Sequence, residues 1–172
     1  MKYKYKRIYS FEPSELEFKI IEKMFAYYKL DNAEVHQFAI CNSVGEISFT
    51  TDNSQEGAKI ATDGDAVVQS TTLDSFFLSG KRDLLPSYIH MDIEGAEVNA
   101  LEGARKLISN HLPKLSISSY HKLEHYWEVP LMIEDIAPGK YEFFMRHYGN
   151  LYDTMCLARP KGSKPKNDVA NQ

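Results

Sequence analysis

The chain has 172 residues, of which 43% are hydrophobic and 26% are charged, and its formal net charge is −4. This composition is typical of one globular domain and excludes disordered and collagen-like chains. The acidic balance gives no sign of the basic face that nucleic-acid binding proteins use, so we expect no nucleic-acid partner.

No stretch of the sequence approaches the roughly 20 apolar residues that a membrane helix needs. The basic N-terminus, residues 1–6, is not followed by the apolar run of a signal peptide. We therefore expect a cytoplasmic protein without membrane contacts. Cys41 and Cys156 are too few and too far apart for a disulfide framework or a zinc motif, and each lies in an apolar run that predicts a buried free thiol.

The first thirty residues predict a strand, a turn and a helix. Residues 7–11 form a β-branched and aromatic run that ends at Pro13, because proline cannot donate a ladder hydrogen bond. Ser14 and Glu17 have the spacing of a capping box. The apolar residues that follow recur at helical spacing and predict one apolar helix face: Leu16, Ile20, Ile21, Met24, Tyr27 and Tyr28.

Strands and helices continue to alternate along the rest of the chain. The predicted strands are residues 35–40, 46–50, 66–73, 88–93, 115–120, 141–148 and 154–158, the last two as an antiparallel pair. The predicted helices are residues 96–110, with Ala100, Leu101, Ala104, Leu107 and Ile108 buried, and residues 124–136, and a polar loop is expected over residues 53–65.

This alternation predicts an α/β fold with a mostly parallel sheet, helices on both faces and a C-terminal antiparallel strand. The strands that contain residues 8–11, 35–40, 89–93 and 115–119 are expected to be neighbours in that one sheet. We expect one domain over residues 1–160, followed by a flexible polar tail over residues 161–172.

Polar residues at the carboxyl ends of the predicted strands are the candidates for a site, because open α/β sheets bind ligands there. Glu12 ends the first strand directly before a helix. An acid in that place can accept both hydroxyl hydrogens of a nucleoside ribose. Its commoner role is a favourable interaction with the helix dipole.

A second candidate is the segment from Asp92 to Glu97, which places three carboxylates within six residues at a strand-to-helix junction. Such crowding can bind a metal, raise a carboxyl pKa or hold a hydroxylated substrate. Capping of the helix explains Glu97 well. It explains Asp92 poorly, because an acid at the end of a central strand is costly without a partner.

His121 follows the strand over residues 115–120 and can act as a general base near neutral pH, although a hydrogen-bonded structural histidine is the commoner outcome. Arg146 and His147 lie on a late strand, where the guanidinium can bind an anion or pair with a carboxylate. The motifs of serine hydrolases, P-loop kinases and zinc proteases are absent, and no metal ligands are predicted.

Six segments in register resemble the FkbM methyltransferases, and the resemblance spans roughly residues 7–159. They are Tyr9-Ser-Phe-Glu-Pro-Ser14, Ala39-Ile-Cys-Asn-Ser-Val-Gly45, Thr72-Leu-Asp-Ser-Phe76, His90-Met-Asp-Ile-Glu-Gly-Ala-Glu97 with Leu101-Glu-Gly-Ala104, Pro113-Lys-Leu-Ser-Ile117 and Tyr120-His-Lys122, continued by Arg146-His-Tyr148 and Asp153-Thr154. The resemblance implies a Rossmann-like fold that moves a methyl group from S-adenosylmethionine to an acceptor oxygen, often on a sugar or natural product.

The resemblance also implies roles for three residues. Glu12 would hold the cofactor ribose, Asp92 would lie close to the methyl group and the acceptor, and His121 would lie where the acceptor approaches. One departure is that only six residues precede Arg7, and none is Gly or Asp. The family's first strand, cofactor loop and helix are therefore expected to be missing, and that strand would lie between the Glu12 and Asp92 strands.

We therefore expect these two strands either to pair directly or to leave edges that recruit a preceding segment or a second copy of the chain. The leading hypothesis is an S-adenosylmethionine-dependent O-methyltransferase with a small-molecule or glycan acceptor, although the missing segment leaves its activity open. One alternative is a non-catalytic methyltransferase-fold module for oligomerisation or for partner or glycan binding. Another is a metal-dependent enzyme that uses the carboxylates of residues 92–97.

Overall fold

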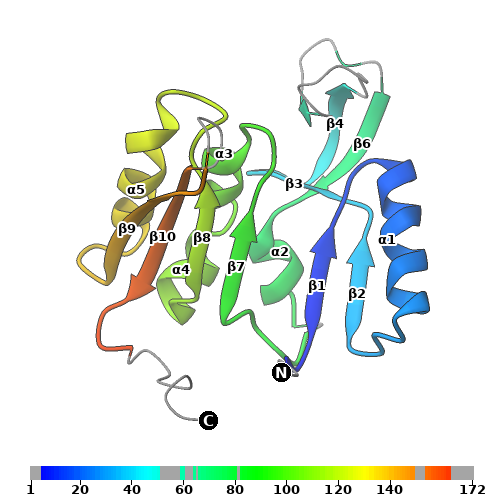
Figure 1. Ribbon diagram of the computed structural model, residues 1–172, viewed down its shortest axis with the longest axis horizontal. Helices are drawn as coiled ribbons and strands as arrows, with labels where there is room; N and C mark the ends of the chain where they lie inside the picture. Colours follow the sequence, from blue (N-terminus) through cyan, green and yellow to red (C-terminus); the bar gives the residue numbers. More distant parts are fainter. Residues whose placement is uncertain are drawn as a thin grey trace.

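The computed structural model describes residues 5–50, 59–60, 64, 66–80, 82–149 and 154–163, which form an α/β fold (Figure 1). The elements are, in chain order, β1 (Ile8–Phe11), α1 (Glu15–Tyr27), β2 (Ala33–His36), β3 (Ala39–Ile40), β4 (Gly45–Thr50), β5 (Lys59–Ile60), β6 (Ala66–Thr71), α2 (Leu73–Leu78), β7 (Tyr88–Met91), α3 (Glu97–Glu102), α4 (Arg105–His111), β8 (Lys114–Ser118), α5 (His125–Ile136), β9 (Tyr141–His147) and β10 (Thr154–Pro160). None of the helices within these ranges has the length and apolar character to cross a membrane.

Two sequence predictions fall partly outside the described residues. The polar loop expected over residues 53–65 is mostly not described, and the short strand β5 lies within it. Of the tail expected over residues 161–172, the first three residues are described. The backbone N–H of Lys161 donates to the carbonyl of Lys140 at 2.8 Å, so the tail begins held against the domain.

The strands form mixed sheets, so the prediction of a mostly parallel sheet was wrong. β1 pairs with β2 in parallel, and a four-stranded sheet has the order β7-β8-β10-β9. In that sheet only the β7–β8 pair is parallel, because β10 runs antiparallel to both β8 and β9. In a third sheet, β3-β6-β4-β5, the two pairs that involve β4 are antiparallel.

The four strands expected as neighbours in one sheet are divided between sheets. Within the described residues β1 pairs only with β2, and β7 pairs only with β8. Figure 1 shows β1 and β7 pointing in the same direction with α2 between them. The ring centroids of Phe77 and Tyr9 are 5.2 Å apart, and those of Phe76 and Phe11 are 4.8 Å apart. Helix α2 therefore joins β1 to the core through aromatic packing.

The strand expected over residues 35–40 is divided into β2 and β3. The chain bends at Phe38, whose N–H donates to the carbonyl of His36 at 3.0 Å. Because of this bend, β3 leaves β1 and pairs with β6 instead.

Helix α1 differs from its prediction in its cap and in its buried face. Ser14 is the N-cap residue, but its hydroxyl donates to Glu17 instead of accepting a backbone N–H, so the capping box was wrong. The helix buries no residue fully, and the residues half-buried against the domain are Phe18, Ile21 and Phe25. Most of the predicted apolar face is exposed, including Leu16, Ile20, Met24, Tyr27 and Tyr28.

The core lies around α3, α4 and α5, and the predicted buried residues of the 96–110 segment are confirmed. Ala100, Leu101, Ala104, Leu107 and Ile108 are all fully buried. Cys41 and Cys156 are buried free thiols, also as predicted. The one predicted helix is two, and α4 begins where the Asp74 carboxylate accepts the N–H groups of Lys106 and Leu107 at 2.9 and 2.8 Å.

Gly103, between α3 and α4, makes a close backbone contact that gives a test of this core. A Cβ atom at this position would lie 2.1 Å from the carbonyl oxygen of Cys41. We expect Gly103→Ala to lower the free energy of unfolding by about 3 kcal/mol, since backbone atoms have to move. Urea denaturation measures this. Asn99→Ala, on the exposed face of α3, is the control and should change stability by less than about 0.5 kcal/mol. Equal stability of the Gly103→Ala variant and the parent would contradict the packing.

Candidate functional site

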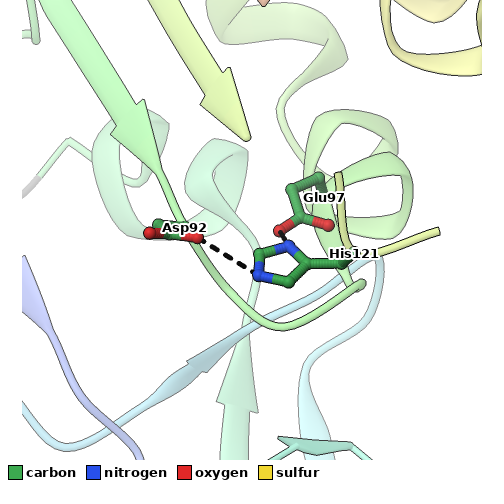
Figure 2. A group of neighbouring side chains, drawn as sticks. All are labelled: Asp92, Glu97 and His121. Atoms are coloured by element: carbon green, nitrogen blue, oxygen red, sulfur yellow. Dashed lines mark hydrogen bonds and ion pairs between the residues drawn. The ribbon is translucent and has the colours of Figure 1, made fainter. Parts of the chain in front are cut away.

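Asp92 and His121 lie together at the carboxyl edge of β7 and β8. The two strands are parallel, and Met91, the last residue of β7, is aligned with Ile117 of β8. Asp92 follows Met91 directly, and His121 lies three residues beyond the end of β8. The Asp92 Oδ1 atom is 3.3 Å from Nε2 of His121 (Figure 2). Two residues predicted from separate strands therefore meet in space.

A tight turn follows Asp92 and places Glu94 beside the same imidazole. Glu94 and Gly95 both have positive φ, at 53° and 91°, and the N–H of Ala96 donates to the carbonyl of Ile93 at 3.2 Å. A left-handed conformation is uncommon for a residue other than glycine and is often found at functional sites. Glu94 Oε2 lies 3.2 Å from Nε2 of His121.

Glu97 is the buried centre of the cluster. Its side chain is 0% exposed, and its Oε1 atom accepts the N–H of Ile93 at 3.0 Å and contacts Nδ1 of His121 at 2.8 Å (Figure 2). Its Oε2 atom lies 3.2 Å from Nδ1 of His125, without the geometry of a hydrogen bond. The sequence assigned Glu97 to helix capping. In the structure it binds the turn and the ring of His121.

The ionisation of the Glu97–His121 pair is coupled. Burial alone would raise the pKa of Glu97, but the hydrogen bonds from His121 and from the N–H of Ile93 outweigh it and lower that pKa. Burial works against a charged His121, but the hydrogen bond to Glu97 and the charges of Glu97, Glu94 and Asp92 outweigh it and raise the pKa of His121. Burial lowers the pKa of His125, which favours its neutral form.

Tyr120 completes the edge of the site. Its hydroxyl donates to Asp92 Oδ1 at 3.2 Å, and its ring packs on the ring of His121 with 4.2 Å between centroids. One ligand-type atom from each of Asp92, Glu97 and His121 lies within 4.8 Å of the other two. The arrangement can therefore accept a proton or bind a cation or a hydroxyl group.

Glu12, the third predicted site residue, directly follows β1. Its Oε1 atom accepts the N–H of Ser14 at 2.9 Å, and burial raises its pKa. β1 and β7 point the same way in Figure 1, so Glu12 and Asp92 each follow the carboxyl end of a strand that runs in this direction, although the two strands belong to different sheets. No hydrogen bond or ion pair in the described part of the chain joins Glu12 to Asp92 or His121.

Strands β9 and β10 contribute a separate set of polar contacts. Nδ1 of His147 lies 2.8 Å from the hydroxyl oxygen of Thr154, which is also 3.2 Å from the hydroxyl of Tyr126. The backbone carbonyl of Thr154 accepts the N–H of Ser119 just before Tyr120 and His121. Arg146 is exposed and forms no ion pair with the described residues. Thr154 entered the sequence analysis only through Asp153-Thr154 in the family resemblance, and His125 had no signal of its own, because their contacts depend on the packing of α5 and β10.

Comparisons with known proteins gave two matches. The family model described as the Methyltransferase FkbM domain matches residues 2–152. The crystal structure of Methyltransferase FkbM from Methylobacillus flagellatus KT at 2.20 Å resolution is similar, with a TM-score of 0.72 and 26% sequence identity over 90% of this chain and 37% of that chain. This chain therefore spans less than half the length of that relative. A search of curated proteins gave no significant match.

Proposed function

Because this chain belongs to the FkbM methyltransferase domain family, we propose that it transfers a methyl group from S-adenosylmethionine to a hydroxyl group of a small-molecule or glycan acceptor. The observation that carries the proposal is the meeting of Asp92 and His121 at the carboxyl edge of two parallel strands. Ligands bind at this edge in open α/β sheets.

Glu12 is the residue of this chain that fits the cofactor. Its carboxylate lies at the end of β1, and the N–H of Ser14 uses only part of its capacity to accept hydrogen bonds. The remaining capacity suits the two hydroxyl groups of a ribose. When bound, S-adenosylmethionine supplies an electrophilic methyl group that needs little further activation.

Asp92 and His121 would orient the acceptor hydroxyl and accept its proton. Positioning of a reacting hydroxyl group contributes much of the rate in such transfers, and a base within hydrogen-bond reach adds to it. Tyr120 holds the Asp92 carboxylate through its hydroxyl, and Glu97 holds the His121 ring through Nδ1. Both catalytic groups are therefore fixed by neighbours before any acceptor binds.

The ribose role of Glu12 is open to direct measurement. Glu12→Ala should weaken S-adenosylmethionine binding by about 1.5–3 kcal/mol, roughly 10- to 150-fold, the usual range for hydrogen bonds to a charged group. Dissociation constants from equilibrium dialysis with labelled cofactor measure the change. Glu15→Ala, an exposed acid on the next helix turn, is the control and should bind like the parent. Equal affinities for the Glu12→Ala variant and the parent would rule this role out.

A second candidate function, a non-catalytic module that self-associates, is favoured by the exposed stripe on α1. The stripe consists of Leu16, Ile20, Met24 and Tyr27, which are 66%, 56%, 43% and 80% exposed. A patch of this kind can pair with its own copy across a two-fold axis.

We expect the chain to form dimers that Ile20→Glu dissociates, because the new charge cannot be buried in an apolar contact. Light scattering after size exclusion measures the mass. Glu22→Lys, exposed on the side of α1 away from the stripe, is the charge control and should remain dimeric. A monomeric parent at all concentrations tested would end this second candidate.

A further inference from the structure

We propose that Asp92 and His121, joined by Glu94, bind one divalent metal cation at the carboxyl edge of β7 and β8. The role of this cation in holding the acceptor hydroxyl rests on the proposed function, but its binding can be tested alone.

The distances around Nε2 of His121 suit ligands of one cation. Asp92 Oδ1 lies 3.3 Å and Glu94 Oε2 lies 3.2 Å from this nitrogen. Neighbouring ligands at metal distances of about 2.0–2.2 Å are about 2.8–3.6 Å apart in octahedral or tetrahedral sites. Both carboxylates are partly exposed, at 45% and 39%, so an ion between them would be reached from solvent.

The buried nitrogen itself is the second observation. The His121 side chain is 9% exposed, and its Nε2 atom is buried and has no hydrogen bond. The carboxylate oxygens of Asp92 and Glu94 are near Nε2, but neither meets hydrogen-bond geometry. Both oxygens therefore lie off the direction in which an Nε2–H bond would point. A cation on the nitrogen lone pair has its other ligands in such off-line positions. Figure 2 shows this side of the ring facing Asp92.

Glu97 gives His121 the orientation of a metal ligand. When His121 is neutral, the Glu97 carboxylate accepts its Nδ1 proton at 2.8 Å, and the lone pair on Nε2 is then free for a cation. Histidine ligands of metals usually donate their other ring N–H to a carboxylate or carbonyl in this way. Glu97 itself is not a ligand in this proposal, because the turn and His121 already occupy its Oε1 atom.

The charge of the cluster also favours a cation. Asp92, Glu94 and Glu97 are three carboxylates, and within the described residues none of them forms an ion pair with a lysine or an arginine. One imidazole with two carboxylates is a mixed nitrogen and oxygen set, which suits Mn²⁺ or Zn²⁺ better than Mg²⁺ or Ca²⁺. The remaining coordination positions would be open to water or to the acceptor hydroxyl, whose pKa the cation would lower. With Nε2 of His121 on the cation, the acceptor's proton would go to the second carboxylate oxygen of Asp92 and not to His121.

Mn²⁺ is the probe for this site. The 172-residue chain, freed of metal with a chelator that is then removed, is titrated with MnCl₂ by calorimetry and by electron paramagnetic resonance of the free ion. We expect one Mn²⁺ per chain. Asp92→Asn and His121→Asn should each weaken binding at least tenfold, and Glu97→Gln about 10- to 100-fold as the residue that orients the histidine. Glu128→Gln, an exposed acid on α5, should leave binding unchanged.

The outcomes separate this inference from the proposed function. Absence of Mn²⁺ binding, or binding that Asp92→Asn and His121→Asn leave unchanged, overturns the cation site. Circular dichroism checks that each variant is folded, and the partly exposed Asp92 gives a variant with little risk to the core. S-adenosylmethionine binding by metal-free protein with no Mn²⁺ site would refute only the cation. A Mn²⁺ site without cofactor binding would support the cation and refute only the methyltransferase proposal.

Discussion

Replacing Glu97 by alanine should lower the free energy of unfolding by about 3–5 kcal/mol, the range for breaking a buried charged pair. The carboxylate is fully buried, and its loss leaves the N–H of Ile93 and Nδ1 of His121 without their acceptor. Urea denaturation in the presence of a chelator measures the metal-free difference. Glu128→Ala, on the exposed side of α5, is the control and should change stability by less than about 0.5 kcal/mol.

The contribution of Glu97 to the free energy of unfolding also depends on pH. The pKa of Glu97 is lowered in the folded chain from its ordinary value of 4.5. The carboxylate therefore stabilises the fold above pH 4.5, and this stabilisation is lost as the pH falls through the lowered folded value. A Glu97→Ala variant as stable as the parent at pH 6 would show that the buried cluster does not hold the turn.

Asp92→Asn should lower methyl transfer about 10²- to 10⁴-fold, the range for loss of a positioned base, while S-adenosylmethionine affinity stays within about a factor of two. The amide keeps the size of the side chain but cannot accept the acceptor's proton. Release of S-adenosylhomocysteine measures transfer with a panel of monosaccharides and polyhydroxylated natural products. Asp83→Asn, an exposed aspartate away from the site, is the control.

Two results would contradict the role of Asp92. Unchanged transfer by Asp92→Asn would show that the carboxylate takes no part in the chemistry. A fall in cofactor affinity as large as the fall in transfer would place Asp92 in cofactor binding, because a residue that acts only on the acceptor should spare the ground-state complex.

The sequence predicted the local features of the site better than the sheet. Hydrophobic periodicity identified the strands that end before Asp92 and His121 and the buried residues of α3 and α4, because burial on one face leaves a regular pattern. It did not predict that the chain bends at Phe38 or that β10 lies between β8 and β9. Strand order depends on contacts between distant segments, which no local pattern records.

Glu97 illustrates the same limit within the site. Its position at the start of a helix fits capping, which is the usual role of an acid there. Its burial is set by His121 and His125, which come from the segment after β8 and from α5. The three acids between residues 92 and 97 were a signal of chemistry, but only the packed chain shows which of them is buried.

Calorimetric titration of S-adenosylmethionine onto the folded 172-residue chain tests the central claim most directly. We expect binding of one cofactor per chain, displaced by S-adenosylhomocysteine and weakened by Glu12→Ala. A chain that is folded by circular dichroism and yet gives no binding, with or without Mn²⁺, would contradict the assignment of methyltransferase function to this chain.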